Sequence, residues 1–338
     1  MNTRMTSAIG FSLAALCLAA PSLSALAEST TLLNASYDVT RELYKDINPA
    51  FAAAYKQETG KAVDVNQSHG GSSKQALAVA AGLDADVVTM NQDPDIDLLV
   101  ERGGRVAADW RDRFPHGASP YTTTSVFLVR KGNPQGIKDW ADLARPGLAV
   151  IVPNPKTSGN GRYAYLAAWG SVIAAGGTET QARDFVRKVF ANVPVFDGGG
   201  RGATTTFTQR DIGDVLVTFE NEAALIAREL GADKFDAVYP SLSIDASAPV
   251  AVVETVVAKR GTAAAAKGYL DFLFTDAGQR LIARHYFRPR SPTVLAENAD
   301  RFPAIKTFQV EKLLGPWGEV QKKHFADGGI FDQIVVNR

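Results

Sequence analysis

Three stretches of the sequence repeat one pattern: an apolar strand, a turn of small polar residues and the start of a helix. The clearest is Pro153–Gly170, which follows an apolar, β-branched run and ends in a segment rich in alanine and aromatic residues. The other two begin at His69 and at Asp197. Such a turn places unpaired backbone N–H groups at the positive end of a helix dipole, which is the outline of an anion site. Three such turns in one chain constrain the fold more than a single one would.

Strands alternate with helices along the chain, which predicts parallel sheets with right-handed crossovers. At 338 residues the chain exceeds the usual limit of a single core, roughly 250–300 residues, so two lobes are expected. We interpret the strand 122–129 as the first crossing between the lobes and 249–258 as the return. Further strands are expected at 31–35, 62–65, 85–89, 148–152, 193–196, 214–219 and 235–239. Ligands of such sheets bind beyond the carboxyl ends of the strands, where all three turns fall.

Residues 1–27 have the pattern of an export signal. Arg4 supplies the positive charge, Ala8–Ala20 an apolar core too short to span a membrane, and Ala25–Ala27 a small-residue cleavage site. Cys17 lies in this core without the preceding small residue that a lipoprotein cleavage site requires. We therefore expect a mature chain that begins at residue 28, contains no cysteine and is located in the periplasm.

Charge and residue spacing argue against several classes of function. The chain has 36 basic and 36 acidic residues and no basic run, which disfavours nucleic acid and membrane surfaces as partners. Neither a metal nor a cofactor is predicted, because no two histidines have the spacing of a metal site and the single cysteine lies in the export signal. A hydrolase nucleophile elbow, Gly-x-Ser-x-Gly, is also absent from the sequence.

The glycine-rich segment Gly198–Ala203 is the motif that most resembles an enzyme's. It partly fits a dinucleotide-binding fingerprint after the expected strand 193–196, and an acidic residue, Glu220 or Glu222, follows at about the required distance of 20 residues. Two considerations oppose this interpretation. The run Thr204–Thr206 is expected to interrupt the following helix, and an exported protein meets no nicotinamide pool.

A small inorganic anion accounts for more of these features. Backbone N–H groups and hydroxyls can surround an oxyanion without any charged side chain, which agrees with the balanced charge of the chain. A site made only of donors would also reject an anion that keeps a proton. The O–H group of that anion would meet no acceptor, at a cost of roughly 1–3 kcal/mol.

Eight segments carry a resemblance to a known family: 32–44, 67–76, 85–89, 119–134, 153–170, 197–207, 213–223 and 324–333. They resemble the periplasmic sulfate- and thiosulfate-binding proteins that serve ABC importers. The resemblance implies an α/β, two-lobed type II periplasmic-binding-protein fold with two crossover strands and an interlobe cleft. Lobe I would comprise 28–121 and 259–338, and lobe II 122–258. It also implies a monomer that docks on the membrane subunits of an importer without inserting into the membrane itself.

The resemblance also implies which residues bind the anion. The expected donors are Asp38 and Ser72 from the first lobe, and Ser158, Gly159, Asn160 and Gly200 from the second. Asp38 and Asn160 would act through their backbone N–H groups, Asn160 at a position where sulfate-type members usually carry glycine. Phe219 stands where sulfate-type members carry a donor tryptophan, so the chain looks closer to the thiosulfate-binding branch. Arg201 adjoins the site but is expected in a structural salt bridge, because an unpaired buried cation is costly.

Two classes of function follow from the sequence. The first is a binding protein that captures sulfate or thiosulfate and delivers it to an ABC importer. The second is an exported enzyme that uses the interlobe cleft for oxyanion chemistry. The first is favoured because the sequence offers no base–nucleophile pair for the second.

Overall fold

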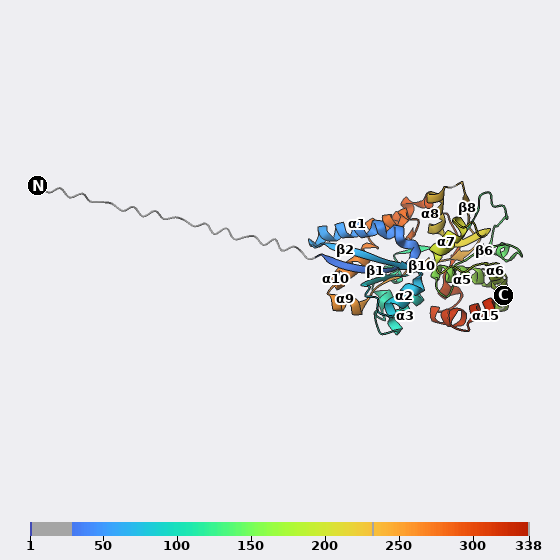
Figure 1. Ribbon diagram of the computed structural model, residues 1–338, viewed down its shortest axis with the longest axis horizontal. Coiled ribbons are helices and arrows are strands. Elements are labelled where there is room, and N and C mark those ends of the chain that lie inside the picture. Colours follow the sequence, from blue (N-terminus) through green and yellow to red (C-terminus); the bar gives the residue numbers. More distant parts are fainter. Residues whose placement is uncertain (2–28, 232, 337–338) are drawn as a thin grey trace.

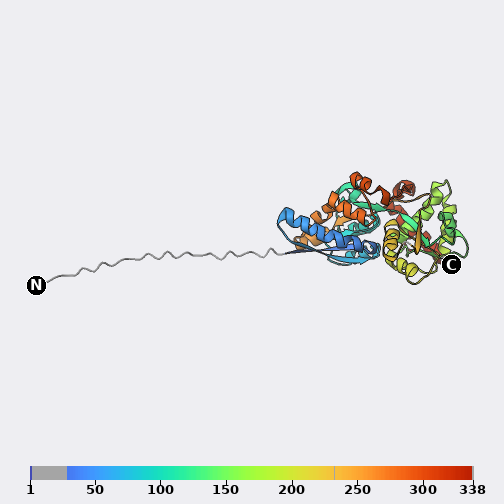
Figure 2. The ribbon, with the colours of Figure 1, turned by 90° about the horizontal axis from the view of Figure 1, so that it is seen from above.

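Two groups of strands and helices lie side by side in the computed structural model (Figures 1 and 2). It describes residues 1, 29–231 and 233–336, so the expected export signal with Arg4 and Cys17 lies outside the described residues. Each group is built around a four-stranded sheet. The two-lobed α/β architecture expected from the sequence is therefore confirmed. Within the described ranges, no helix is both long enough and apolar enough to cross a membrane.

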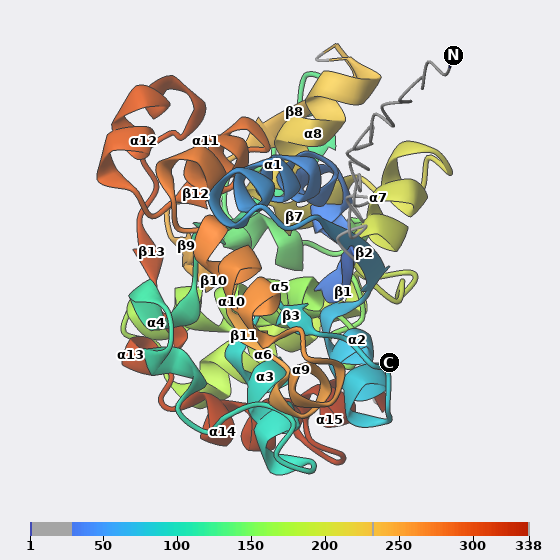
Figure 3. The same ribbon diagram turned by 90° about the vertical axis from the view of Figure 1, so that its left-hand side faces the viewer.

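The sheet of the first lobe has the strand order β11-β3-β1-β2. Its strands are β1 (Thr30–Tyr37), β2 (Val63–Gly70), β3 (Val87–Thr89) and β11 (Val250–Val252). The helices of this lobe are α1 (Arg41–Thr59), α2 (Ser72–Ala80), α3 (Asp93–Glu101), α4 (Pro115–Ala118), α9 (Glu254–Arg260), α10 (Ala263–Phe272), α11 (Asp276–Arg284) and α12 (Pro292–Glu297). In Figure 3, which faces this lobe, α1 and α11 lie above β1 and β3, and α2 and α3 lie below. A short 3-10 turn, Asp38–Thr40, joins β1 to α1.

The sheet of the second lobe has the strand order β6-β7-β5-β8. Its strands are β5 (Ser125–Arg130), β6 (Val150–Ile151), β7 (Val215–Phe219) and β8 (Phe235–Val238). Its helices are α5 (Gly159–Ala174), α6 (Glu179–Ala191), α7 (Gly200–Thr208) and α8 (Glu220–Leu230). Every residue of β7 is buried, because its apolar run VLVTF lies inside the sheet between β6 and β5.

The chain crosses between the lobes twice. The outward path is β4 (Tyr121–Thr123) followed by β5, and the return is β10 (Ala246–Ser247) followed by β11. β4 pairs antiparallel with both β10 and β12 (Arg288–Pro289), which makes a small sheet where the crossings meet. A further parallel pair is formed by β9 (Ser243–Ile244) and β13 (Thr307–Phe308).

The expectation of purely parallel sheets is wrong. β1 is parallel to β2 and β3, but β11 is antiparallel to β3. In the second lobe β6 and β7 are parallel, whereas β5 is antiparallel to β7 and β8. The antiparallel strands β5 and β11 are the ones that enter each sheet from the crossings.

Two of the expected strands also differ. The segment 193–196 forms no strand among the described residues, because Pro194 lacks the N–H that a sheet ladder needs. The expected return strand 249–258 is a strand only over Val250–Val252 and continues as α9. This helix has Glu254 in its first turn, Lys259 and Arg260 in its last, and left-handed Gly261 after it, and these helix-end features outweigh the β-branched valines.

The threonine run Thr204–Thr206 does not interrupt α7, contrary to expectation. Thr205 Oγ1 donates to Arg201 O at 3.1 Å, four residues back in the helix. Thr208 Oγ1 donates to Thr204 O at 2.8 Å in the same way. These bonds satisfy the hydroxyls of Thr205 and Thr208 inside the helix. Thr204 Oγ1 donates to Glu222 at 3.2 Å, whereas Thr206 Oγ1 has no partner among the described residues.

The C-terminal segment returns to the second lobe. It contains α13 (Val310–Leu313), α14 (Trp317–Val320), a π-helical turn (Gln321–Phe325) and α15 (Ile330–Val336). α15, drawn in red in Figure 1, packs on α6. Lys156 of the second lobe pairs with Asp327 and Asp332 of this segment at 3.1 and 3.0 Å. The sequence analysis placed all of 259–338 in the first lobe, whereas α15 contacts α6 of the second lobe. It placed 249–258 in the second lobe, whereas β11 pairs with β3 in the sheet of the first.

His324 is buried where this segment meets α5. Its ring lies 4.6 Å from that of Trp169, and its Nδ1 lies 2.9 Å from the Tyr165 hydroxyl. A neutral imidazole can accept a hydrogen bond from that hydroxyl, whereas a protonated one cannot. Burial, together with the charge of Lys323 and against that of Glu179, lowers the pKa of His324 to about 4.

We predict that His324 makes the protein less stable in acid. The pKa of a histidine in the unfolded chain is about 6.5. As the pH falls from this value to 4, the unfolded state binds a proton that most of the folded state does not bind. The free energy of unfolding therefore falls by about 3 kcal/mol. His324→Phe should lose less stability than the wild type over this range in urea unfolding. His116→Asn, at an exposed position, is the control and should follow the wild type. Equal losses for wild type and His324→Phe would contradict the prediction.

Candidate anion-binding site

The predicted site residues lie at the beginnings of helices. Ser72 is the first residue of α2, Ser158 caps α5, Gly200 begins α7, and Phe219 directly precedes α8. Asp38 begins the 3-10 turn before α1. The side chains of Ser72, Ser158, Asn160 and Phe219 are at most 2% exposed. Helix beginnings expose N–H groups that have no partner within the helix, so donors are gathered wherever such ends meet.

A chain of contacts joins these helix beginnings. Asp38 reaches the start of α7, where its carboxylate accepts a hydrogen bond from Arg201 N at 3.1 Å. Gly200 lies against the amide of Asn160, since a Cβ built on Gly200 would be 3.0 Å from Asn160 Nδ2. Gly159 in turn lies against Asn91 of the first lobe, whose backbone N–H donates to Ser72 Oγ at 3.2 Å. The structure therefore brings together six of the seven predicted residues, the exception being Phe219.

Phe219 is connected to the others through one aromatic contact. Its ring lies 6.0 Å from that of Tyr163 in an edge-on arrangement, and Tyr163 belongs to the first turns of α5. Phe219 is completely buried and therefore offers an apolar surface without a donor. Its contact with an anion stays a prediction.

The lobes touch through backbone atoms at Gly71. A Cβ at this position would lie 2.5 Å from Thr157 O and 2.9 Å from Gly198 O, both of the second lobe. These distances are shorter than any real Cβ contact, so only glycine allows the approach. At Gly199 the close neighbour is a side chain, since a Cβ there would lie 2.4 Å from Asp38 Oδ2, which would have to move.

The two serine hydroxyls are held in ways that leave them able to donate. Ser158 Oγ accepts a hydrogen bond from Gly161 N at 3.4 Å, which caps α5. Ser72 Oγ accepts from Asn91 N and donates to Met90 Sδ at 3.6 Å. Because a thioether sulfur is a weak acceptor, redirecting the Ser72 hydrogen to an anion would lose little.

Arg201, in the first turn of α7, is paired. Arg201 lies 2.8 Å from Glu42 of the first lobe and 3.2 Å from Glu222 of the second, which confirms the expected structural salt bridge. Burial raises the pKa of Glu222 to about 8, and the charge of Arg201 opposes that rise. Burial likewise raises the pKa of Asp38, opposed by the hydrogen bond from the Arg201 N–H and by the charge of Arg201. The attraction of an anion would therefore come mainly from N–H dipoles.

A second buried ion pair links the lobes on the other side of α5. Arg162 lies 3.6 Å from Asp95 of α3, with both side chains less than a tenth exposed. Ser73 and Gln92 donate to the two oxygens of Asp95 at 2.8 and 2.9 Å. The sequence analysis missed this pair, because Asp95 lies outside the segments it singled out and the pattern of 153–170 does not indicate a partner for Arg162.

The sequence analysis also missed the side-chain amides at this site. Asn91 Oδ1 and both amide atoms of Asn160 are buried and find no hydrogen-bond partner among the described residues. The position of Asn91 could have indicated this role, because it follows the carboxyl end of β3 directly after Met90. Polar residues at that edge of a parallel sheet are frequently functional.

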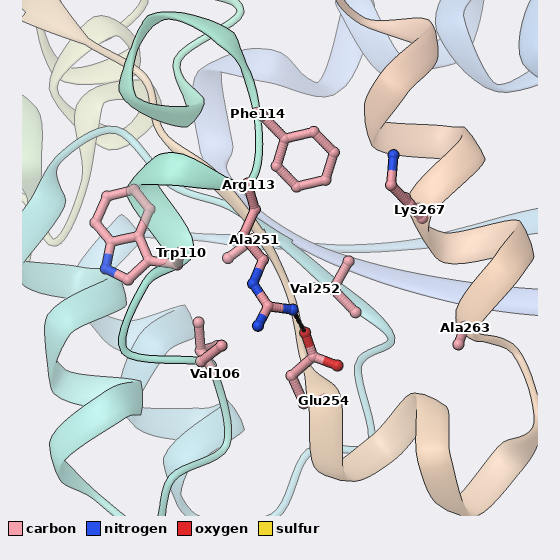
Figure 4. A pocket seen from close by; sticks show the side chains of 10 residues that line it. Val106, Trp110, Arg113, Phe114, Ala251, Val252, Glu254, Ala263 and Lys267 are labelled. Carbon is pink, nitrogen blue, oxygen red and sulfur yellow. Dashed lines mark hydrogen bonds and ion pairs between the residues drawn. The ribbon is translucent and has the colours of Figure 1, made fainter.

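The described residues show no metal cluster, and a hollow in the first lobe lies apart from this site. No group of three or more histidine, cysteine, aspartate or glutamate side chains in the described ranges could hold a metal ion. A separate hollow of 310 Å³ lies in the first lobe, with Trp110, Phe114 and the Arg113–Glu254 ion pair among its walls (Figure 4). It is lined by none of the seven predicted residues.

Comparisons with known proteins find relatives over most of the chain. Residues 32–288 match the family model of bacterial extracellular solute-binding proteins. The chain is 58% identical to the thiosulfate-binding protein of Pseudomonas aeruginosa, over 90% of this chain and 91% of that protein. It is 51% identical to the sulfate-binding protein of Escherichia coli, over 92% and 94% of the two chains. Among solved structures, the sulfate-binding protein SubI from Mycobacterium tuberculosis superposes with a TM-score of 0.80 at 34% identity, over 88% of this chain and 99% of SubI.

We predict that Gly71→Ala holds the lobes apart. Gly71 has φ −57° and ψ 135°, which alanine adopts without strain, so the added methyl group acts only on the opposite lobe. Overpacking of this kind should destabilise the closed arrangement by about 1–3 kcal/mol. Small-angle scattering should then give a larger radius of gyration than for the wild type. Gly318→Ala is the control, because nothing lies within 4 Å of a Cβ there. A wild-type profile for Gly71→Ala would contradict the interlobe contact.

Proposed function

The chain belongs to the family of bacterial extracellular solute-binding proteins, and we propose that it captures sulfate or thiosulfate between its lobes and delivers the anion to the membrane subunits of an ABC importer. The observation that carries this proposal is the meeting of helix beginnings from both lobes around buried hydroxyls. Its relatives named as sulfate- and thiosulfate-binding proteins, similar over almost their full length, support the choice of anion. We infer a monomer in the periplasm, as the sequence analysis expected.

The donors suit a dehydrated dianion. Hydroxyls of Ser72 and Ser158 and backbone N–H groups at Asp38, Gly159, Asn160 and Gly200 would surround it. Hydrogen bonds to a charged acceptor are stronger than neutral ones, so several together can replace the water that the anion loses. Because Arg201 is already paired with two carboxylates, no cation is needed in contact with the ligand.

The alternative of an exported enzyme receives no support. Catalysis by a serine requires a base within hydrogen-bond reach of its hydroxyl. The recorded partners are Gly161 N for Ser158, and Asn91 N and Met90 Sδ for Ser72. None of these groups is a base. We therefore propose binding and transport, without turnover.

We further propose that thiosulfate binds at least as well as sulfate, because of Phe219. Sulfate presents four oxygens of similar demand, whereas thiosulfate replaces one by a larger sulfur that accepts hydrogen bonds weakly. A tryptophan N–H directed at that sulfur would be poorly used. The buried phenyl ring of Phe219 requires no partner, and the remaining donors still serve three oxygens.

The experiment is calorimetric titration of ligand-stripped protein with sulfate and thiosulfate. Phe219→Trp should shift the ratio of the two affinities towards sulfate by about 1–2 kcal/mol. This figure is the gain from one charge-assisted hydrogen bond to sulfate minus the cost of repacking strain. Phe196→Trp, in the same lobe but packed on Phe190 and Phe331, is the control and should leave the ratio unchanged. A ratio that does not move in Phe219→Trp would remove position 219 from the site. Failure of the wild type to bind either anion would refute the proposed function.

A further inference from the structure

Asn160 carries a buried side-chain amide that the protein does not satisfy. The residue is the second of α5 and is 2% exposed. Both Oδ1 and Nδ2 find no hydrogen-bond partner among the described residues. Most buried polar side-chain atoms are hydrogen-bonded, so an amide with two unsatisfied atoms calls for an explanation.

The surroundings of the amide explain why the protein offers Nδ2 no acceptor. Nδ2 lies 3.0 Å from where a Cβ on Gly200 would be, so it faces the first residue of α7. Asn160 itself stands at the beginning of α5. Helix beginnings present N–H donors, and their carbonyl groups point along the helix away from this end. An amide N–H₂ between two such ends faces the donors of both helices, and neither of the acceptors that stand at these helix starts, the Asp38 carboxylate and Asn91 Oδ1, is its partner.

Two asparagines outside the site form hydrogen bonds through their side-chain amides. Asn192 donates from Nδ2 to Leu143 O and to Arg145 O, both at 2.8 Å. Asn133 donates to Ile137 O at 2.7 Å and accepts from Ile137 N at 2.9 Å. Buried amide oxygens without a partner also occur at Gln67, Asn91, Gln92 and Gln321, but among the described residues Asn160 is the buried amide in which both polar atoms lack a partner.

We propose that the side-chain amide of Asn160 donates a hydrogen bond from Nδ2 to an oxygen of the bound anion, in addition to any contact through its backbone N–H. This inference rests on the proposed function, since it assigns a further specificity contact to the same ligand. An oxyanion is the acceptor that two converging helix beginnings lack. The amide remains neutral, so it adds a donor without adding a charge.

The assignment also distributes the donors differently from the expectation drawn from the sequence. Phe219, before α8, contributes no donor, whereas Asn160 contributes one from α5. Because sulfate and thiosulfate both present at least three oxygens, a donor directed at oxygen serves either anion. Loss of the Asn160 amide should therefore weaken the binding of both anions by a similar factor. Phe219→Trp, in contrast, is expected to change their ratio.

The test is Asn160→Ala in the otherwise unchanged protein. This variant keeps the backbone N–H and removes only the amide. We expect the dissociation constants for sulfate and for thiosulfate each to rise about tenfold or more, the usual effect of losing a hydrogen bond to a charged group. Urea unfolding without ligand should give the same stability as the wild type or a higher one, because an unsatisfied polar group has been removed.

Asn192→Ala is the matched control. It removes an amide that bonds two backbone carbonyls outside the site, so it should lower stability and leave both affinities unchanged. Wild-type affinities in Asn160→Ala would overturn the inference while leaving the proposed function intact. A fall in stability like that of Asn192→Ala, without loss of affinity, would instead assign the Asn160 amide a structural role. A wild type that binds neither anion would overturn both proposals.

Discussion

The unpaired N–H groups at helix beginnings are the physical constraint on which this structure depends. Each such N–H group lowers the stability of the folded protein if it is buried without an acceptor. The beginnings of α2, α5 and α7 are buried where the lobes meet. The protein satisfies part of this demand itself, with Ser158 capping α5 and Asp38 accepting from Arg201 N. An anion would satisfy what remains. Under the proposed function, anion binding and the closure of the lobes would both follow from the same unsatisfied donors.

The two arginines beside the site are paired with carboxylates, so neither competes with these dipoles. Arg201 lies between Glu42 and Glu222, and Arg162 faces Asp95, so each arginine is paired across or along the lobe boundary. A buried arginine without a partner would be costly, whereas a paired one contributes little net charge. These pairs would also help to hold the closed arrangement, because each joins elements from both lobes.

The sequence predicted the local chemistry of the site better than its contacts. The small-residue turns could be found because glycine, serine and asparagine have specific roles before helices, and the structure places a helix start at each of them. The carboxylate of Asp38 reaching α7, and Asn91 packing on Gly159, depend on how two lobes approach, which local sequence patterns do not encode. Pro194 and the helix-end residues of α9 are visible in the sequence, but the sequence analysis gave more weight to the neighbouring β-branched runs and therefore predicted strands there.

Diffraction from crystals of the mature protein grown with thiosulfate would test the central claim most directly. After removal of residues 1–27, Met90 is the only sulfur-containing residue of the chain, and its Sδ lies 3.6 Å from Ser72 Oγ. An anomalous map of sulfur therefore contains its own reference beside the site. The account predicts ligand sulfur peaks near Met90, between Ser72, Ser158 and Gly200. Ligand peaks in the hollow beside Trp110, or only on the surface, would contradict it.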